Sequence, residues 1–231
     1  MAGLPRLYSR DVTGLNPITP KAGALSINRP DGSGPGFTAL INTTVTTLDF
    51  SRSSRGASPG DPKPYTFVPF ARDAVSWSAK AGGHAPADLT TAQLGAIYEC
   101  TATNWLQIDP SLANATVKPY LPPSSSDTRV ASLKALGGGT AIVPGACVTA
   151  GPRNDRGTDP ALDDIDVVFP YSVGVYIDQV YQGHGTAVES PGPLTLRSIN
   201  TVAPVDAAQN ITRRSSRRRT SRRRPGVRSS Y

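Results

Sequence analysis

VKPYLPPSSSDTRVASLKAL, residues 117–136, carries the clearest indication of how this chain folds. Residues 117–121 have the alternation of a short strand, and Pro122 ends it. Val130, Leu133 and Leu136 then recur at helical spacing until three glycines, 137–139, end the helix. A strand that leads through a short hydroxyl-rich loop into a helix is typical of an α/β protein.

The rest of the chain repeats this alternation with short elements. It has 231 residues, 38% of them hydrophobic, and 22 each of Gly and Pro, enough for a core and many turns. We expect a mixed α/β protein with one large domain or two small lobes. Strands are expected over 25–28, 45–50, 65–78, 117–121, 164–170, 194–199 and 202–205, and helices over 37–42, 89–100 and 130–136. Residues 171–181 are expected to form either a helix or a buried strand-to-helix turn.

The net charge of +7 is concentrated at one end of the chain. Nine arginines and no acidic residue follow Ile211, so removing these nine charges leaves −2 for residues 1–212. The body therefore lacks the basic run that tracks a nucleic-acid backbone, and we expect no nucleic acid bound to it. The low-complexity tail over 211–231 is expected to be disordered.

Two further features bear on the compartment. The sequence shows neither an apolar run of membrane-spanning length nor a signal-peptide pattern at its start. Cys100 and Cys147 are either two buried thiols or one disulfide, and a disulfide would favour an oxidising compartment.

Hydroxyl-rich loops are the strongest functional signal. In 124–129, Ser124, Ser126 and Thr128 offer donors beside a helix start, whose free backbone N–H groups favour anions. Arg129 can pair with an oxyanion through two N–H groups, so the loop suits phosphate, sulfate or a carboxylate. The alternative is an ordinary serine-rich helix cap.

Two other loops have the same ingredients and also follow expected strands. Ser33 lies in the turn-rich 29–34, near an expected helix cap, and Ser53 and Ser54 lie in the polar loop 51–56. Each loop alone has a plain interpretation as a turn or a solvated loop. Three of them in one chain predict convergent donors for a single anion.

Patterns typical of catalysis or metal binding are weak. His84 and His184 lie in glycine-rich loops without metal-ligand spacing, and no nucleophile elbow or phosphate-binding P-loop is present. The acidic residues over 159–166 are interpreted as a solvated turn rather than a calcium loop. Arg72-Asp73 is either a surface ion pair or a pair near a cleft. We expect no cofactor, no metal and no enzyme activity.

Several segments together resemble the actinobacterial form of the phosphate-binding substrate-binding proteins of ABC importers. The resemblance spans roughly residues 11–210. It rests on RPDGS at 29–33, LDFSRSSR at 48–55, FVPFARDAVSW at 67–77, residues 89–100 with Asn104-Trp105, the segment 119–129, and Pro170-Tyr171-Ser172.

The resemblance implies a type II periplasmic-binding-protein fold, with two lobes and a ligand cleft. Residues 1–64 would belong to lobe 1, 65–170 mainly to lobe 2, and 171–210 would return to lobe 1. It also implies a monomer outside the cytoplasm or at the cell surface that delivers phosphate or a similar oxyanion to importer membrane subunits, and a Cys100–Cys147 disulfide. The implied ligand residues are Ser33, Ser53, Ser54, Ser124, Ser126, Asp127, Thr128 and Arg129.

The sequence departs from the family pattern in three ways. The family's first strand with its Gly-Ser-Asp-Thr loop is not found, so the first lobe is expected to be incomplete. Ser125 and Asp127 replace two glycines of the family loop, and the Asp127 carboxylate would repel an anion. Past residue 212 the family pattern gives way to arginines. Two alternatives therefore remain: a degraded, non-functional fragment, and a nucleic-acid-associated protein that acts through its tail.

Overall fold

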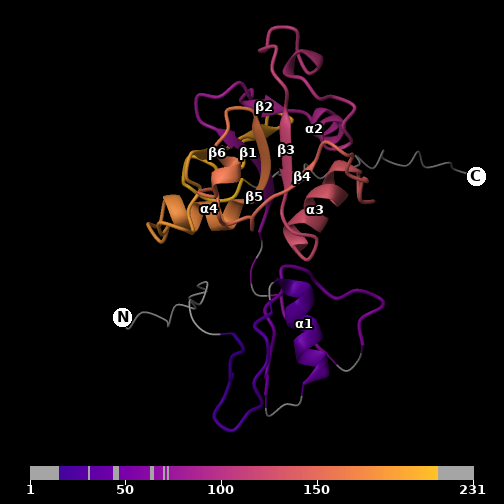
Figure 1. Ribbon diagram of the computed structural model, residues 1–231, viewed down its shortest axis with the longest axis vertical. Coiled ribbons are helices and arrows are strands. Elements are labelled where there is room, and N and C mark those ends of the chain that lie inside the picture. Colours follow the sequence, from indigo (N-terminus) through magenta and orange to yellow (C-terminus); the bar gives the residue numbers. More distant parts are fainter. Residues whose placement is uncertain are drawn as a thin grey trace, which may run out of the picture.

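The structure, a computed structural model, describes residues 16–30, 32–43, 47–62, 65–69, 71 and 73–212. The arginine-rich tail, Arg72 of the expected ion pair, and the first part of the expected strand 45–50 lie outside the described residues. Figure 1 shows a sheet with its helices at one end of the molecule and the segment containing α1 at the other.

A five-stranded mixed sheet organises the larger part. Its order is β4-β3-β5-β1-β6, in which β3 runs parallel to β4 and β5, and β1 runs antiparallel to β5 and β6. A parallel pair, β2 and β7, forms a second small sheet. The strands are β1 (Val75–Lys80), β2 (Asp88–Leu89), β3 (Lys118–Leu121), β4 (Thr149–Ala150), β5 (Val167–Ser172), β6 (Leu194–Leu196) and β7 (Ser198–Ile199).

Four α-helices are found among the described residues. In Figure 1, α2 (Thr91–Tyr98) and α3 (Asp127–Leu136) lie together on one side of the sheet, and α4 (Val173–Val180) lies on the other. The fourth, α1 (Ser33–Asn42), belongs to the other part of the molecule. The expected mixed α/β class and the expected strand–loop–helix over 117–136 are confirmed.

Burial of apolar side chains explains why these elements hold together. β5 is buried along its whole length because it is the middle strand of the sheet. Trp105, Tyr98 and Leu94 fill one core between the sheet and α2, and Phe169 and Tyr171 belong to a second core cluster. Each fully buried apolar side chain of this size stabilises the fold by roughly 1.5–3 kcal/mol.

The disulfide between Cys100 and Cys147 is present. It ties the end of α2 to the loop that follows α3, with the two Cα atoms 5.8 Å apart. Cys100 has a φ of 62°, the left-handed conformation of a residue that reverses the chain just after a helix.

Several expected strands are shorter or absent. Residues 65–69 form no strand, because Phe67 packs on Phe37 of α1, with ring centroids 5.4 Å apart, rather than beside another strand. The strand expected over 65–78 begins only at Val75, where β5 provides a partner. Residues 47–50 are also not a strand. Residues 25–28 and 202–205 contribute only isolated bridges.

Candidate functional site

The 124–129 loop is organised by its own side chains. The Ser126 hydroxyl caps α3 by accepting a hydrogen bond from the backbone N–H of Arg129 at 3.4 Å. Arg129 Nη1 in turn donates to the carbonyl of Pro122 at 3.0 Å. A helix cap and an anion-binding loop were the two alternative interpretations of 124–129, and Ser126 does cap the helix. It fixes the start of α3 and the position of Arg129.

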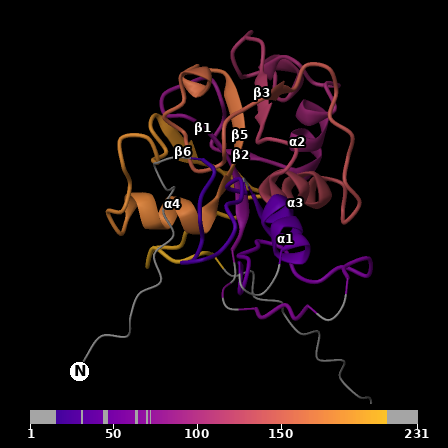
Figure 2. The ribbon, with the colours of Figure 1, turned by 60° about the horizontal axis from the view of Figure 1, so that its bottom comes forward.

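Three separate segments meet at this helix start. Ser54 Oγ donates to Asp127 Oδ2 at 3.4 Å and lies 3.1 Å from Ser33 Oγ, which also accepts the Ser54 backbone N–H. Ser33 is the first residue of α1, and Asp127 is the first residue of α3. Figures 1 and 2 show α1 next to the starting turn of α3. The two helices therefore present their positive ends to one junction.

A close backbone approach at this junction requires glycine. Gly32 has a φ of 96°, and a Cβ built on it would lie 3.0 Å from the carbonyl oxygen of Ser125. A side chain at residue 32 would be strained in this conformation and would push the 124–129 loop away. Gly32 was not singled out from sequence, although its place beside Ser33 in a turn-rich loop was the available signal.

The remaining residues of the expected set are arranged less directly. Ser53 is turned into its own loop, where its hydroxyl donates to the Arg55 carbonyl at 3.2 Å and accepts the Arg55 N–H at 3.1 Å. Ser124 is exposed, and Thr128 accepts a hydrogen bond from Ser132 through its carbonyl. Ser33, Ser54 and Asp127 are thus linked directly, whereas Ser53 and Ser124 are not linked to them by a hydrogen bond among the described residues.

Asp127 gives the junction an unusual electrostatic character. A carboxylate in the first turn of a helix is stabilised by the partial positive charge there. It also accepts the Ser54 hydroxyl, a donor that a bound anion would use. The junction therefore already contains a negatively charged acceptor beside its hydrogen-bond donors.

Arg55 is the residue of this region that sequence reasoning missed. It forms a bidentate ion pair with Asp61, at 2.8 Å from Nη1 to Oδ2 and 2.7 Å from Nη2 to Oδ1. That hydrogen bonding raises the pKa of Arg55 and lowers the pKa of Asp61. The two residues are six positions apart across a turn, and no periodic pattern marks such a pair.

Asp73 lies at the start of another helix. Its carboxylate accepts the Ser172 hydroxyl at 2.6 Å and the Gly174 backbone N–H at 2.8 Å, both at the beginning of α4. Neither interpretation of Arg72-Asp73 predicted this contact. Its effect is to join the chain just before β1 to the strand–helix turn at 172–174.

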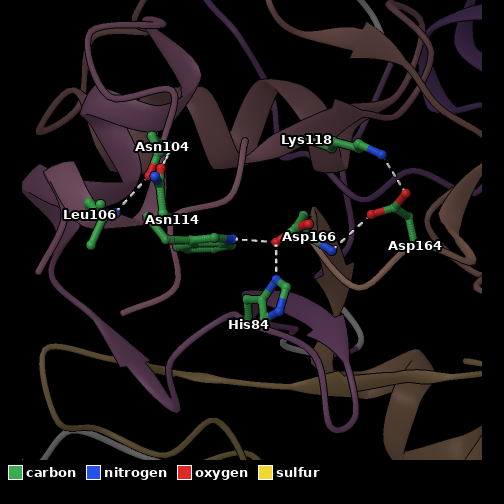
Figure 3. A network of polar contacts seen from close by, with 8 residues as sticks. His84, Asn104, Leu106, Asn114, Lys118, Asp164 and Asp166 are labelled. Atoms are coloured by element: carbon green, nitrogen blue, oxygen red, sulfur yellow. Dashed lines mark hydrogen bonds and ion pairs between the residues drawn. The ribbon is translucent and has the colours of Figure 1, made fainter. Parts of the chain in front are cut away.

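The interpretation of the acidic residues over 159–166 as a solvated turn was wrong for Asp166. Asp166 is only 8% exposed, and its Oδ1 accepts a hydrogen bond from the buried Trp105 indole at 2.8 Å. The same oxygen lies 2.9 Å from His84 Nδ1 (Figure 3). Asp164 accepts the Asp166 backbone N–H at 2.9 Å and pairs with Lys118. These contacts hold the core in place. No group of three or more metal-ligating side chains occurs among the described residues.

Replacing Asp166 with asparagine should lower the free energy of unfolding by about 1 kcal/mol. An amide oxygen can still accept one donor, but the hydrogen bonds lose their charge assistance. Urea unfolding followed by tryptophan fluorescence measures this change. Asp163→Asn is the control, because Asp163 forms an ion pair with Lys80 while its side chain is 62% exposed, and such pairs contribute little. Equal effects of the two variants would contradict the structural role of Asp166.

Within the described part of the chain, no helix has both the length and the apolar character needed to cross a membrane.

Comparison with protein-family models and with curated proteins gave no match. Solved structures with a similar arrangement include an ABC-type phosphate transport receptor from Vibrio cholerae, with 16% identity over 58% of this chain and 48% of that one, and a TM-score of 0.44. PstS from Borrelia burgdorferi matches with 15% identity over 58% of this chain and 49% of that one, and a TM-score of 0.41. The chain spans about half the length of these two structures.

Proposed function

We propose that this chain binds phosphate or a similar small oxyanion at the junction of residues 32–33, 53–54 and 124–129. The observation that carries the proposal is the position of Ser54, which links Ser33 at the start of α1 to Asp127 at the start of α3. Hydroxyl donors from separate segments converge there on two helix N-termini, an arrangement that favours an anion.

Arg129 provides the positive charge of the proposed site. A guanidinium has five N–H donors, and one of those of Arg129 contacts the Pro122 carbonyl. That contact fixes the side chain at the start of α3 while other donors can reach an oxyanion. Ser124, Ser126 and Thr128 complete the proposed ligand set.

The biological role that we propose is solute binding for an ABC importer, outside the cytoplasm or at the cell surface, by a monomer without enzyme activity. The ligand would lie between two lobes. In this proposal residues 1–64 belong to lobe 1, 65–170 mainly to lobe 2, and 171–210 return to lobe 1. The junction of α1 and α3 lies between the first two of these segments.

Replacing Arg129 with alanine should weaken phosphate binding at least about tenfold, because a charge-assisted hydrogen bond contributes roughly 1.5–3 kcal/mol. Isothermal titration of phosphate into the purified, oxidised chain measures this, and Thr128→Ala tests the neighbouring hydroxyl. Lys134→Ala is the matched control, because Lys134 is an exposed cation in the last turn of the same helix. Absence of saturable phosphate binding by the unmodified chain would refute the proposal.

A nucleic-acid-associated role through the tail is the second candidate. Nine arginines within residues 213–228 favour it, because each arginine that neutralises a nucleic-acid phosphate releases counterions. Such binding would weaken steeply with salt and would not change in Arg129→Ala. Saturable phosphate binding that depends on Arg129 distinguishes the first candidate from the second.

A further inference from the structure

We propose that Arg55 is a positioning residue for phosphate at this junction: it fixes the Ser53-Ser54 loop without contacting the anion. This inference rests on the proposed function. No role for Arg55 was predicted from the sequence, and its contacts in the folded chain assign one.

The Arg55 guanidinium closes the loop that carries the serines. It forms the bidentate pair with Asp61, and Nη1 also donates to the Gly56 carbonyl at 2.9 Å. Asp61 in addition accepts the Ser58 backbone N–H at 2.6 Å. Residues 55–61 are therefore held as one closed turn immediately after Ser54.

The same guanidinium attaches this turn to α1. It lies over the rings of Phe37 and Phe67, 5.3 Å from each centroid, and Phe37 belongs to α1. An arginine that lies over two neighbouring aromatic rings gains cation–π attraction and loses freedom of movement. The distance between the serine loop and the first turn of α1, where Ser33 lies, is thereby fixed.

Ser53 links the position of Ser54 to that of the turn at 55–61. Its hydroxyl bonds to both the N–H and the carbonyl of Arg55, so the backbone before the turn cannot rotate freely. Ser54 is then held opposite Ser33 and Asp127. Donors that are ordered before a ligand arrives bind it more tightly, because less conformational entropy is lost on binding.

The guanidinium groups of Arg55 and Arg129 differ in their partners. The carboxylate of Asp61 contacts both terminal nitrogens of Arg55, and the side chain of Asp61 is only 15% exposed. Together with the Gly56 carbonyl, this carboxylate occupies three of the five N–H donors of Arg55, so a phosphate would compete with Asp61 for the guanidinium. We therefore assign the guanidinium of Arg55 to holding the loop, although its charge also interacts with Asp127, and we assign direct contact with the anion to Arg129.

The test is a thermodynamic cycle on the full oxidised chain, with Arg55→Lys, Asp61→Asn and the double variant titrated with inorganic phosphate. Lysine keeps the charge but has neither the two-pronged fork nor the planar stacking surface of arginine. We expect each single variant to bind phosphate about tenfold more weakly and the double variant to be no weaker than either. Hydrogen exchange of residues 51–58 should become faster in all three.

Two controls make the outcome specific. Asp49→Asn removes an ion pair with Lys21 in the same part of the molecule, where Asp49 is 64% exposed, and should leave the affinity unchanged. Trp77 and Trp105 belong to the sheet part, so unfolding followed by their fluorescence should not change in the Arg55 variants.

Three results would overturn the inference. The first is wild-type phosphate affinity in Arg55→Lys, and the second is unchanged exchange over 51–58. The third is an additive, roughly hundredfold loss in the double variant, which would make Arg55 and Asp61 independent contributors. An unmodified chain that binds no phosphate would overturn the proposed function itself, and the role of Arg55 with it.

Discussion

Replacing Cys100 and Cys147 together with serine is expected to lower the free energy of unfolding by about 4 kcal/mol. The bond closes a loop with a sequence separation of 47 residues, and opening it restores that loop's freedom in the unfolded chain. This is a large fraction of the 5–15 kcal/mol that typically stabilises a domain.

The local packing indicates that the native structure depends on the bond. The Cys147 backbone N–H contacts Cys100 Sγ at 3.0 Å, and a Cβ built on Gly145 would lie 2.5 Å from the same sulfur. The tightly packed segment leads into β4, which pairs with β3. β3 in turn leads into the 124–129 loop, so the bond supports the scaffold of the proposed site.

Urea unfolding followed by tryptophan fluorescence, with and without reductant, measures this effect. The unmodified chain should unfold at a lower urea concentration when reduced, and the double serine variant should not respond to reductant. Equal midpoints for the oxidised and reduced unmodified chain would contradict the prediction.

Replacing Asp127 with asparagine is expected to tighten phosphate binding roughly 30-fold. A unit charge about 4 Å from a dianion is repelled by about 2 kcal/mol even at the dielectric constant of water, and asparagine removes this repulsion with little change of shape. Loss of the favourable contact between the carboxylate and the α3 dipole should lower the free energy of unfolding by only about 0.3–1 kcal/mol.

The measurement is a phosphate titration at a pH where phosphate is a dianion. Asp163→Asn is the control, because it removes the same charge at an exposed ion pair with Lys80 at the end of β1. A gain in Asp127→Asn alone would show that the anion binds at the start of α3. Equal affinities of the unmodified chain and Asp127→Asn would mean that the anion does not approach this carboxylate.

Parts of the proposed site could be predicted because the necessary signals are local in sequence. Ser126 caps α3 three residues before Arg129, and Thr90 caps α2 in the same way, accepting the backbone N–H of Gln93. Hydrogen bonds over three residues depend on residue type and spacing, both of which are visible in a sequence. The contacts of Ser33, Ser54 and Asp127 bring the three loops together, whereas their joint binding of an anion stays a prediction.

Other parts could not be predicted because their signals are distant in sequence. Asp166 was grouped with its acidic neighbours as solvated, yet it accepts the indole N–H of Trp105, 61 residues away. Phe67 reads as a strand residue, yet its ring packs on Phe37 and on Arg55. Neither assignment can be made before the folded chain brings these side chains together.

The α/β class, the helices predicted over 89–100 and 130–136, and the hydroxyl-rich character of the three loops could all be read from the sequence. These features follow from short-range periodicity and from hydrogen bonds between near neighbours. The contacts of Ser54 with Ser33 and Asp127, and those of Arg55 with α1, became apparent only in the folded chain. Such long-range contacts form where burial and chain closure permit, and no local pattern in the sequence records them.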